Sequence, residues 1–181
     1  MMKINKFKTS GLIILMIVLL LVGCSGNETS NLHINDNKHQ VANEMDEVIS
    51  NYIIQKYTST KVYPSTEKLF EVHKIYGTSE SDGVISVYMY SYFGGFNKST
   101  GLESQMGHSL PALIRLQKKE TGYTVVDYTE PKDGNLYVSS LEKMFPEKYL
   151  NIAQRDVGNI DDLEQLMDNR VQQWLDGELN E

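Results

Sequence analysis

The feature that most constrains this chain is an apolar run near its N-terminus, Leu12 to Val22, eleven residues without a polar side chain. The segment before it carries Lys3, Lys6 and Lys8 and no acidic residue. As a helix, eleven residues rise about 16 Å, roughly half the hydrocarbon thickness of a bilayer, which is too short for a standard transmembrane span. A basic segment followed by a short apolar run is typical of a secretion signal peptide. We therefore expect residues 1–23 to direct export and to take no part in the folded domain.

The only cysteine, Cys24, follows this run directly, and one cysteine can form no intramolecular disulfide. The sequence Leu21-Val22-Gly23-Cys24 resembles the lipobox of bacterial lipoproteins. The resemblance implies cleavage before Cys24 and a diacylglycerol on its thiol, which anchors the protein to the extracytoplasmic face of the cell membrane. Two acyl chains give durable anchoring where one is marginal. The alternative is an uncleaved N-terminal anchor with a buried, free Cys24.

Cleavage at this position would leave a strongly acidic mature protein. Residues 1–23 hold three of the 17 basic residues and no acid, so 14 basic and 24 acidic residues remain, a net charge of −10. Such a protein is repelled by anionic head groups and wall polymers, and it lacks the basic face that nucleic-acid binding requires. The excess of Lys over Arg is typical of AT-rich genomes such as those of many Gram-positive bacteria.

Residues 24–40 are expected to form the lipidated cysteine and a flexible tether. Only two of the 16 residues after Cys24 are aliphatic, too few to form a core of their own. His33 and His39 fall in this segment, where we expect solvated side chains rather than a metal site.

From Val41 onward the sequence predicts one domain, residues 41–181. Apolar residues spaced by three and four predict a helix over 41–57. Stretches rich in β-branched and aromatic residues predict four strands, over 69–76, 84–93, 110–117 and 123–128. Asp82-Gly83 predicts the first turn, and residues 94–109 predict a long loop. We expect Pro111 at the start or edge of its strand.

Helices are predicted after the last strand. The sequence Ser139-Ser140-Leu141-Glu142 has the spacing of a capping box and predicts a short helix that ends before Pro146, followed by a second helical turn. Residues 163–175 predict a C-terminal helix capped near Asp161, with Trp174 in the core. The order of elements predicts an α+β fold: a four-stranded antiparallel meander with helices on one side, similar in pattern to cystatin or nuclear-transport-factor-like folds.

Two sets of residues are candidates for acid/base chemistry. Glu71 and His73 are two apart on the first strand, hence on one face, where they form either an acid/base or metal half-site or a hydrogen-bonded pair. His108 and Ser109 are the only adjacent base and nucleophile, but neighbours on a strand point to opposite faces, so a polar loop residue is the plainer interpretation of His108. No zincin, dithiol, Walker or dinucleotide motif occurs. We therefore expect no enzyme activity, no cofactor and no bound metal.

Three tyrosines form a stripe on one face of the second predicted strand, Tyr88, Tyr90 and Tyr92. Tyrosine is well suited to ligand recognition because it combines area with a hydroxyl at low entropic cost. The alternative is that helices cover the stripe and leave only the hydroxyls at its rim.

The stretch over residues 109–151 carries a second resemblance, in the segments Ser109–Leu116, Gly122–Tyr128, Pro131–Gly134 and Met144–Pro146. It resembles extracytoplasmic domains of Gram-positive bacteria that also occur beside membrane-bound metallopeptidases of the beta-lactam sensor type. The zinc-binding signature of those peptidases is missing here, so the resemblance implies an accessory or sensing domain.

Three functions remain open at this point. The first is a lipid-anchored, non-enzymatic domain that binds a ligand or partner. The second is a small hydrolase or transferase of the nuclear-transport-factor-like kind that uses His73 and Glu71. The third is an interaction lipoprotein in immunity or envelope assembly.

Overall fold

The structure is a computed structural model that describes residues 28–179, with side chains from residue 42 onward. The predicted signal peptide, the lipobox and Cys24 lie outside the described residues. The chain divides into two units, residues 1–40 and 41–181. All side-chain contacts below belong to the second unit.

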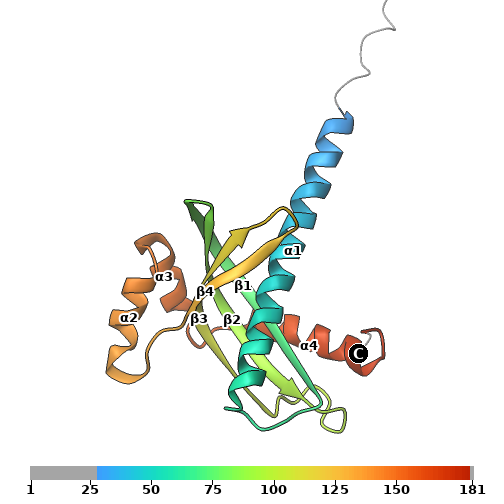
Figure 1. Cartoon of the computed structure of the whole chain (residues 1–181). Coiled ribbons are helices and arrows are strands. Elements are labelled where there is room, and N and C mark those ends of the chain that lie inside the picture. Colours follow the sequence, from blue (N-terminus) through green and yellow to red (C-terminus); the bar gives the residue numbers. More distant parts are fainter. Residues whose placement is uncertain (1–27, 180–181) are drawn as a thin grey trace, which may run out of the picture. The chain divides into compact units, whose positions relative to one another are not determined.

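The second unit is built on one four-stranded antiparallel sheet with the strand order β1-β2-β3-β4 (Figure 1). Its strands are β1 (Lys68–Ser81), β2 (Val84–Phe96), β3 (Met106–Lys118) and β4 (Tyr123–Thr129). The helices of the chain are α1 (Glu28–Thr60), the short 3-10 helix η2 (Gly134–Leu136), α2 (Tyr137–Met144), α3 (Glu147–Asp156) and α4 (Asp161–Leu175). The predicted α+β class and the antiparallel meander are confirmed.

A two-residue turn fixes the register of the first hairpin. Ser81 pairs with Val84, and the residues between them, Asp82 and Gly83, have φ angles of 53° and 73°. Two consecutive positive φ angles define the type I′ turn, whose twist matches that of the flanking strands. The turn predicted at Asp82-Gly83 is therefore confirmed.

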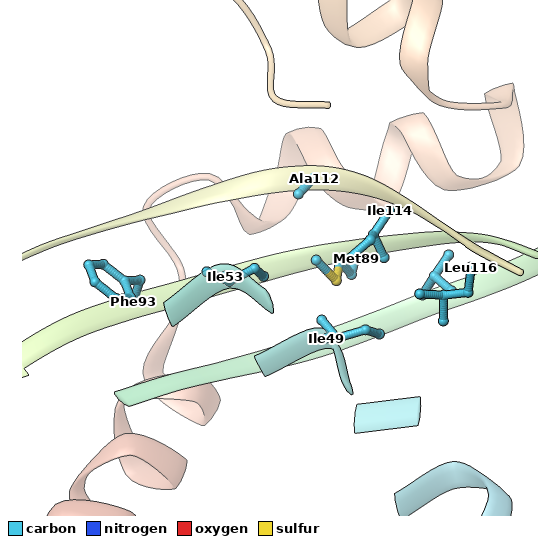
Figure 2. Close-up of a cluster of buried hydrophobic side chains, with 8 residues drawn as sticks. Ile49, Ile53, Met89, Phe93, Ala112, Ile114 and Leu116 are labelled. Atoms are coloured by element: carbon cyan, nitrogen blue, oxygen red, sulfur yellow. The ribbon is translucent and has the colours of Figure 1, made fainter. Parts of the chain in front are cut away.

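Helix α1 covers one face of the sheet. Ile49 and Ile53 of α1 are fully buried against side chains of the two central strands. Figure 2 shows this cluster, which we call the α1 core. Its strand members are Val87, Met89, Phe93, Ala112, Ile114 and Leu116.

The opposite face of the sheet is covered as well. Tyr90 of β2 packs with Trp174 of α4, and Tyr88 packs with Phe145 and the residues around α2 and α3. Our expectation of helices on one side only is therefore wrong. The reason is that β2 is apolar or aromatic on both faces, so both must be shielded from water. The predicted core position of Trp174, which is 3% exposed, is confirmed.

Several boundaries differ from those expected. Helix α1 begins at Glu28, so the residues up to Gln40 that we expected in a flexible tether are helical. Extending a formed helix adds one hydrogen bond for each residue fixed, without the cost of a new nucleus. Strands β2 and β3 extend into the expected loop, which shrinks to residues 97–105. Pro111 lies inside β3, at a point where β4 has not yet begun to pair, so its missing N–H costs no ladder bond.

The predicted helix caps are not formed. Helix α2 starts at Tyr137, and its N-cap residue Leu136 has no polar side chain with which to cap it. Ser139 lies inside the helix rather than at its N-cap, and the hydroxyls of Ser139 and Ser140 donate to the carbonyls of Leu136 and Tyr137. Helix α3 runs for 10 residues rather than one turn. The N-cap of α4 is Ile160, so Asp161 lies inside the helix.

Candidate functional site

Glu71 of β1 is a fully buried carboxylate at the centre of a hydrogen-bond network. Ser50 of α1 donates to its Oε2 at 2.7 Å, and Ser91 of β2 donates to its Oε1 at 2.6 Å. A buried carboxylate is costly unless hydrogen bonds and opposite charge satisfy it. These two hydroxyls supply part of that compensation and tie three elements together.

His73 supplies the opposite charge. Its Nδ1 lies 3.0 Å from Oε2 of Glu71, and its Nε2 lies 3.4 Å from Oδ1 of Asp46 on α1. Burial lowers the pKa of His73, but the hydrogen bonds with Asp46 and Glu71 outweigh it and raise the pKa to about 9. Both ring nitrogens therefore carry protons at neutral pH, and each donates to a carboxylate. We call Asp46, Ser50, Glu71, His73 and Ser91 the Glu71 network.

The main chain at Glu71 is also bonded from a second helix. Nη1 of Arg170 on α4 donates to the carbonyl oxygen of Glu71 at 3.3 Å, and Ser50 lies 3.4 Å from the same oxygen. Since β1 is an edge strand, these side chains satisfy a carbonyl at the sheet border. Glu71 thus connects to both α1 and α4.

The Glu71 network offers no poised nucleophile. A serine nucleophile needs its proton accepted by a neutral histidine nitrogen, but here both hydroxyls donate to Glu71 and both nitrogens of His73 face carboxylates. The side chain of His73 is 4% exposed and that of Glu71 is fully buried. Of the two interpretations left open by the sequence, the structure matches the hydrogen-bonded pair.

The sequence did not lead us to Asp46, Ser50 or Ser91. The sequence pattern around Ser50 and Ser91 could have identified these two residues. Ser91 interrupts the apolar series of Val87, Met89 and Phe93 on β2, and Ser50 adjoins the buried face of α1. A small polar residue at a core-facing position indicates a buried partner.

His108 lies apart from this network, in an aromatic cluster at the C-terminal end of α1. Its Nδ1 lies 2.8 Å from the hydroxyl of Tyr63, and its ring contacts those of Tyr57 and Phe93. Burial lowers the pKa of His108, so the ring is neutral at physiological pH. Its Nε2 is buried and makes no hydrogen bond within the described protein. Ser109 points to the other face of the sheet, so the adjacent pair does not act together.

The tyrosine stripe is mostly covered. Tyr88 and Tyr90 are 8% and 2% exposed beneath the C-terminal helices, and only Tyr92 is half-buried. The hydroxyl of Tyr88 bonds that of Ser79 at 3.2 Å. Of the two alternatives for the stripe, the covered one holds for Tyr88 and Tyr90. Tyr92 alone keeps part of its ring accessible.

Tyr92 borders an open groove of about 310 Å³. The rest of the groove is lined by the six consecutive residues 104–109, which lead from the loop into β3. This segment belongs to the long loop over residues 94–109 that is predicted from the sequence. We call this recess the β3 groove.

Two further observations concern the described residues. Among the described residues, no set of three or more His, Cys, Asp and Glu side chains is placed to hold a metal ion. Within the same part of the chain, no helix is long and apolar enough to cross a membrane.

Comparison of the chain with known proteins adds no assignment to this geometry. No protein family, curated protein or solved structure matches it.

Proposed function

We propose that the chain is a lipid-anchored protein whose domain binds a ligand or partner on the extracytoplasmic face of the cell membrane, without catalysing a reaction. The observation that supports this most directly is the contrast between its two candidate sites. The Glu71 network is closed and internally satisfied, whereas the β3 groove is open. A closed network stabilises a fold, and an open groove on a rigid sheet suits recognition.

The hydrolase or transferase alternative receives less support. That alternative needs Glu71 and His73 to face a pocket, but their polar atoms are directed at each other, at two serines and at Asp46. No substrate atom could approach them without displacing these partners.

The anchor is tested by the substitution Cys24→Ala. We expect the wild-type chain to incorporate a radiolabelled fatty acid and to fractionate with membranes, because the thiol is the only attachment point of this kind. The C24A chain should take up no label and accumulate as unprocessed precursor. Equal labelling of the two chains would refute the anchor and with it the proposed location.

The binding site is tested by photo-cross-linking in intact cells. A benzophenone amino acid in place of Leu102, which is 42% exposed on the loop that continues into the β3 groove at Ser104, should give a defined adduct with the occupant of the groove. The control is the same probe in place of Val138, which is 55% exposed on α2 and outside the groove. If the two positions give the same products, or neither gives one, the β3 groove is not the binding site.

A further inference from the structure

The chemistry of the β3 groove narrows the class of ligand. The side chains that reach the groove from the Tyr92 face and the loop carry a phenol, two hydroxyls and an amide, from Tyr92, Ser104, Ser109 and Gln105; Met106 and His108, whose side chains pack on the α1 face, border it with their backbone. None of these is charged at physiological pH, although the whole chain has a net charge of −7. An uncharged polar lining gives a ligand no ion pair, so it favours a neutral partner rich in hydrogen-bonding groups.

Internal hydrogen bonds orient the two polar side chains at the loop end of the groove. The hydroxyl of Ser104 donates to the carbonyl of Met106 at 2.9 Å. The amide nitrogen of Gln105 donates to Oγ1 of Thr100 at 3.1 Å and to the carbonyl of Glu103 at 2.8 Å. With their donors committed, both side chains present oxygen acceptors. Such fixed acceptors are suited to ligand hydroxyl groups, because little side-chain entropy is lost on binding.

Tyr92 provides the apolar part of the groove. Its ring packs against the cluster of α4 and β1 that includes Phe70 and Trp174, so it is held in place and only half-buried. A fixed aromatic ring offers a flat surface with a low entropic cost of binding. A pyranose ring combines an apolar C–H face with a rim of hydroxyls, and this combination fits a tyrosine beside fixed oxygen acceptors.

We propose that the β3 groove binds a neutral carbohydrate ring that stacks on Tyr92 and donates hydrogen bonds to Ser104 and Gln105. This inference rests on the proposed binding function and assigns its ligand class.

The test is saturation-transfer NMR on the full-length protein in phosphatidylglycerol nanodiscs, prepared without glycoside detergents. The probes are two neutral disaccharides, cellobiose and N,N′-diacetylchitobiose, with choline as a cationic probe. Choline is included because Glu164 and Asp168 of α4 lie near enough to Tyr92 to help raise its pKa, behind the larger effect of burial. We expect transfer to the ring protons of at least one disaccharide and none to choline.

Variants locate the site and separate stacking from folding. Tyr92→Ala should raise the Kd of the disaccharide about tenfold or more, the equivalent of about 1.4 kcal/mol. Tyr92→Phe should keep the Kd within about threefold, since it retains the ring. Gln105 is exposed, so Gln105→Ala leaves the domain core intact; it removes the acceptor together with the two loop hydrogen bonds of the amide and should also weaken binding. Tyr137→Ala, at a tyrosine outside the groove, is the matched control and should change nothing.

Each other outcome is decisive. Transfer to choline alone, lost in Tyr92→Ala, would overturn the carbohydrate assignment while leaving the proposed binding function in place. The carbohydrate assignment would also be overturned if saturation were transferred to neither disaccharide. The same holds if the substitutions at Tyr92 and Gln105 left the binding of the disaccharide unchanged. The cross-linking at residue 102 tests the proposed function separately, because it needs no assumption about the ligand and leaves Tyr92, Ser104 and Gln105 in place.

Discussion

His73 lies between two carboxylates inside the domain, and this position determines what its ionisation does. Glu71 on one side is fully buried, so it needs a cationic partner in the folded state. Asp46 on the other side is 48% exposed and keeps part of its hydration. The imidazolium is therefore the group that makes a buried carboxylate tolerable.

A pH dependence of stability follows from this arrangement. The pKa of His73 rises from 6.5 to about 9 on folding, so the folded protein binds more protons than the unfolded chain between these values. The stabilisation is complete below pH 6.5 and is lost as the pH rises through 9; by linkage it amounts to about 3 kcal/mol at most. Urea unfolding at a series of pH values from 6 to 10 should show this loss.

Asp46→Asn is the informative variant for this prediction. It removes one of the two carboxylates that raise the pKa of His73, at a half-exposed position where the fold tolerates the change. The decline in stability should then shift to lower pH and become smaller. A decline identical to that of the wild type would contradict the assigned role of His73.

Only part of this residue-scale picture was predictable. The proximity of Glu71 and His73 follows from their spacing on one strand, because alternate side chains share a face. The contacts with Asp46, Ser50 and Ser91 were not predictable, since they depend on how α1 and β2 pack against β1. Local periodicity contains no information on that packing.

At the scale of elements, the central strand β2 explains both the correct and the incorrect expectations. Its alternation of Val87, Met89 and Phe93 was sufficient to predict a strand with a buried face. Its other face carries tyrosines, whose side chains are compatible with a core or a surface. The composition of this face therefore could not show whether it is buried or exposed. In the structure the C-terminal helices cover Tyr88 and Tyr90.

The pairing of β2 with β3 depends on a glycine. A Cβ at position 107 would lie 2.2 Å from the carbonyl oxygen of Phe93 and 3.0 Å from Cα of Gly94. Backbone atoms cannot rotate away as a side-chain tip can, so the strands would have to separate locally. Gly107→Ala should lower the free energy of unfolding by roughly 2 kcal/mol or more and alter the β3 groove. Chemical denaturation followed by circular dichroism measures the change.

A second glycine is the control. A Cβ at Gly101 meets nothing within 4 Å, although its φ of 62° carries a backbone cost of about 1 kcal/mol for alanine. Gly101→Ala should therefore be clearly milder than Gly107→Ala. Equal losses for the two variants would mean that the contact with Phe93 does not limit the strand pairing.

At the scale of the whole domain, a single sheet contributes side chains to a hydrophobic core on each of its two faces. The α1 core lies on one face, and the clusters of α2, α3 and α4 lie on the other. Glu71 is bonded to α1 through its side chain and to α4 through its carbonyl. Loss of either helix would expose a face of the same sheet to water, so the two cores are expected to unfold together.

The single tryptophan makes this cooperativity measurable. Trp174 packs against Phe70 on the face of the sheet that α4 covers. It belongs to a different buried cluster from the α1 core. Its fluorescence reports the α4 face, whereas far-UV circular dichroism reports all helices and strands. Thermal transitions recorded by the two signals should coincide. A tryptophan transition at lower temperature would show that α4 detaches before the rest of the domain unfolds.

The burial pattern of the Glu71 network also has a kinetic consequence. Water reaches its members mainly at Asp46, because the side chains of His73 and Glu71 are 4% and 0% exposed. The proton on Nδ1 of His73, which faces the fully buried Glu71, can therefore exchange with solvent only when α1 moves away from β1. The exchange lifetime of the Nδ1 proton of His73 thus reports how often that helix opens, independent of any ligand.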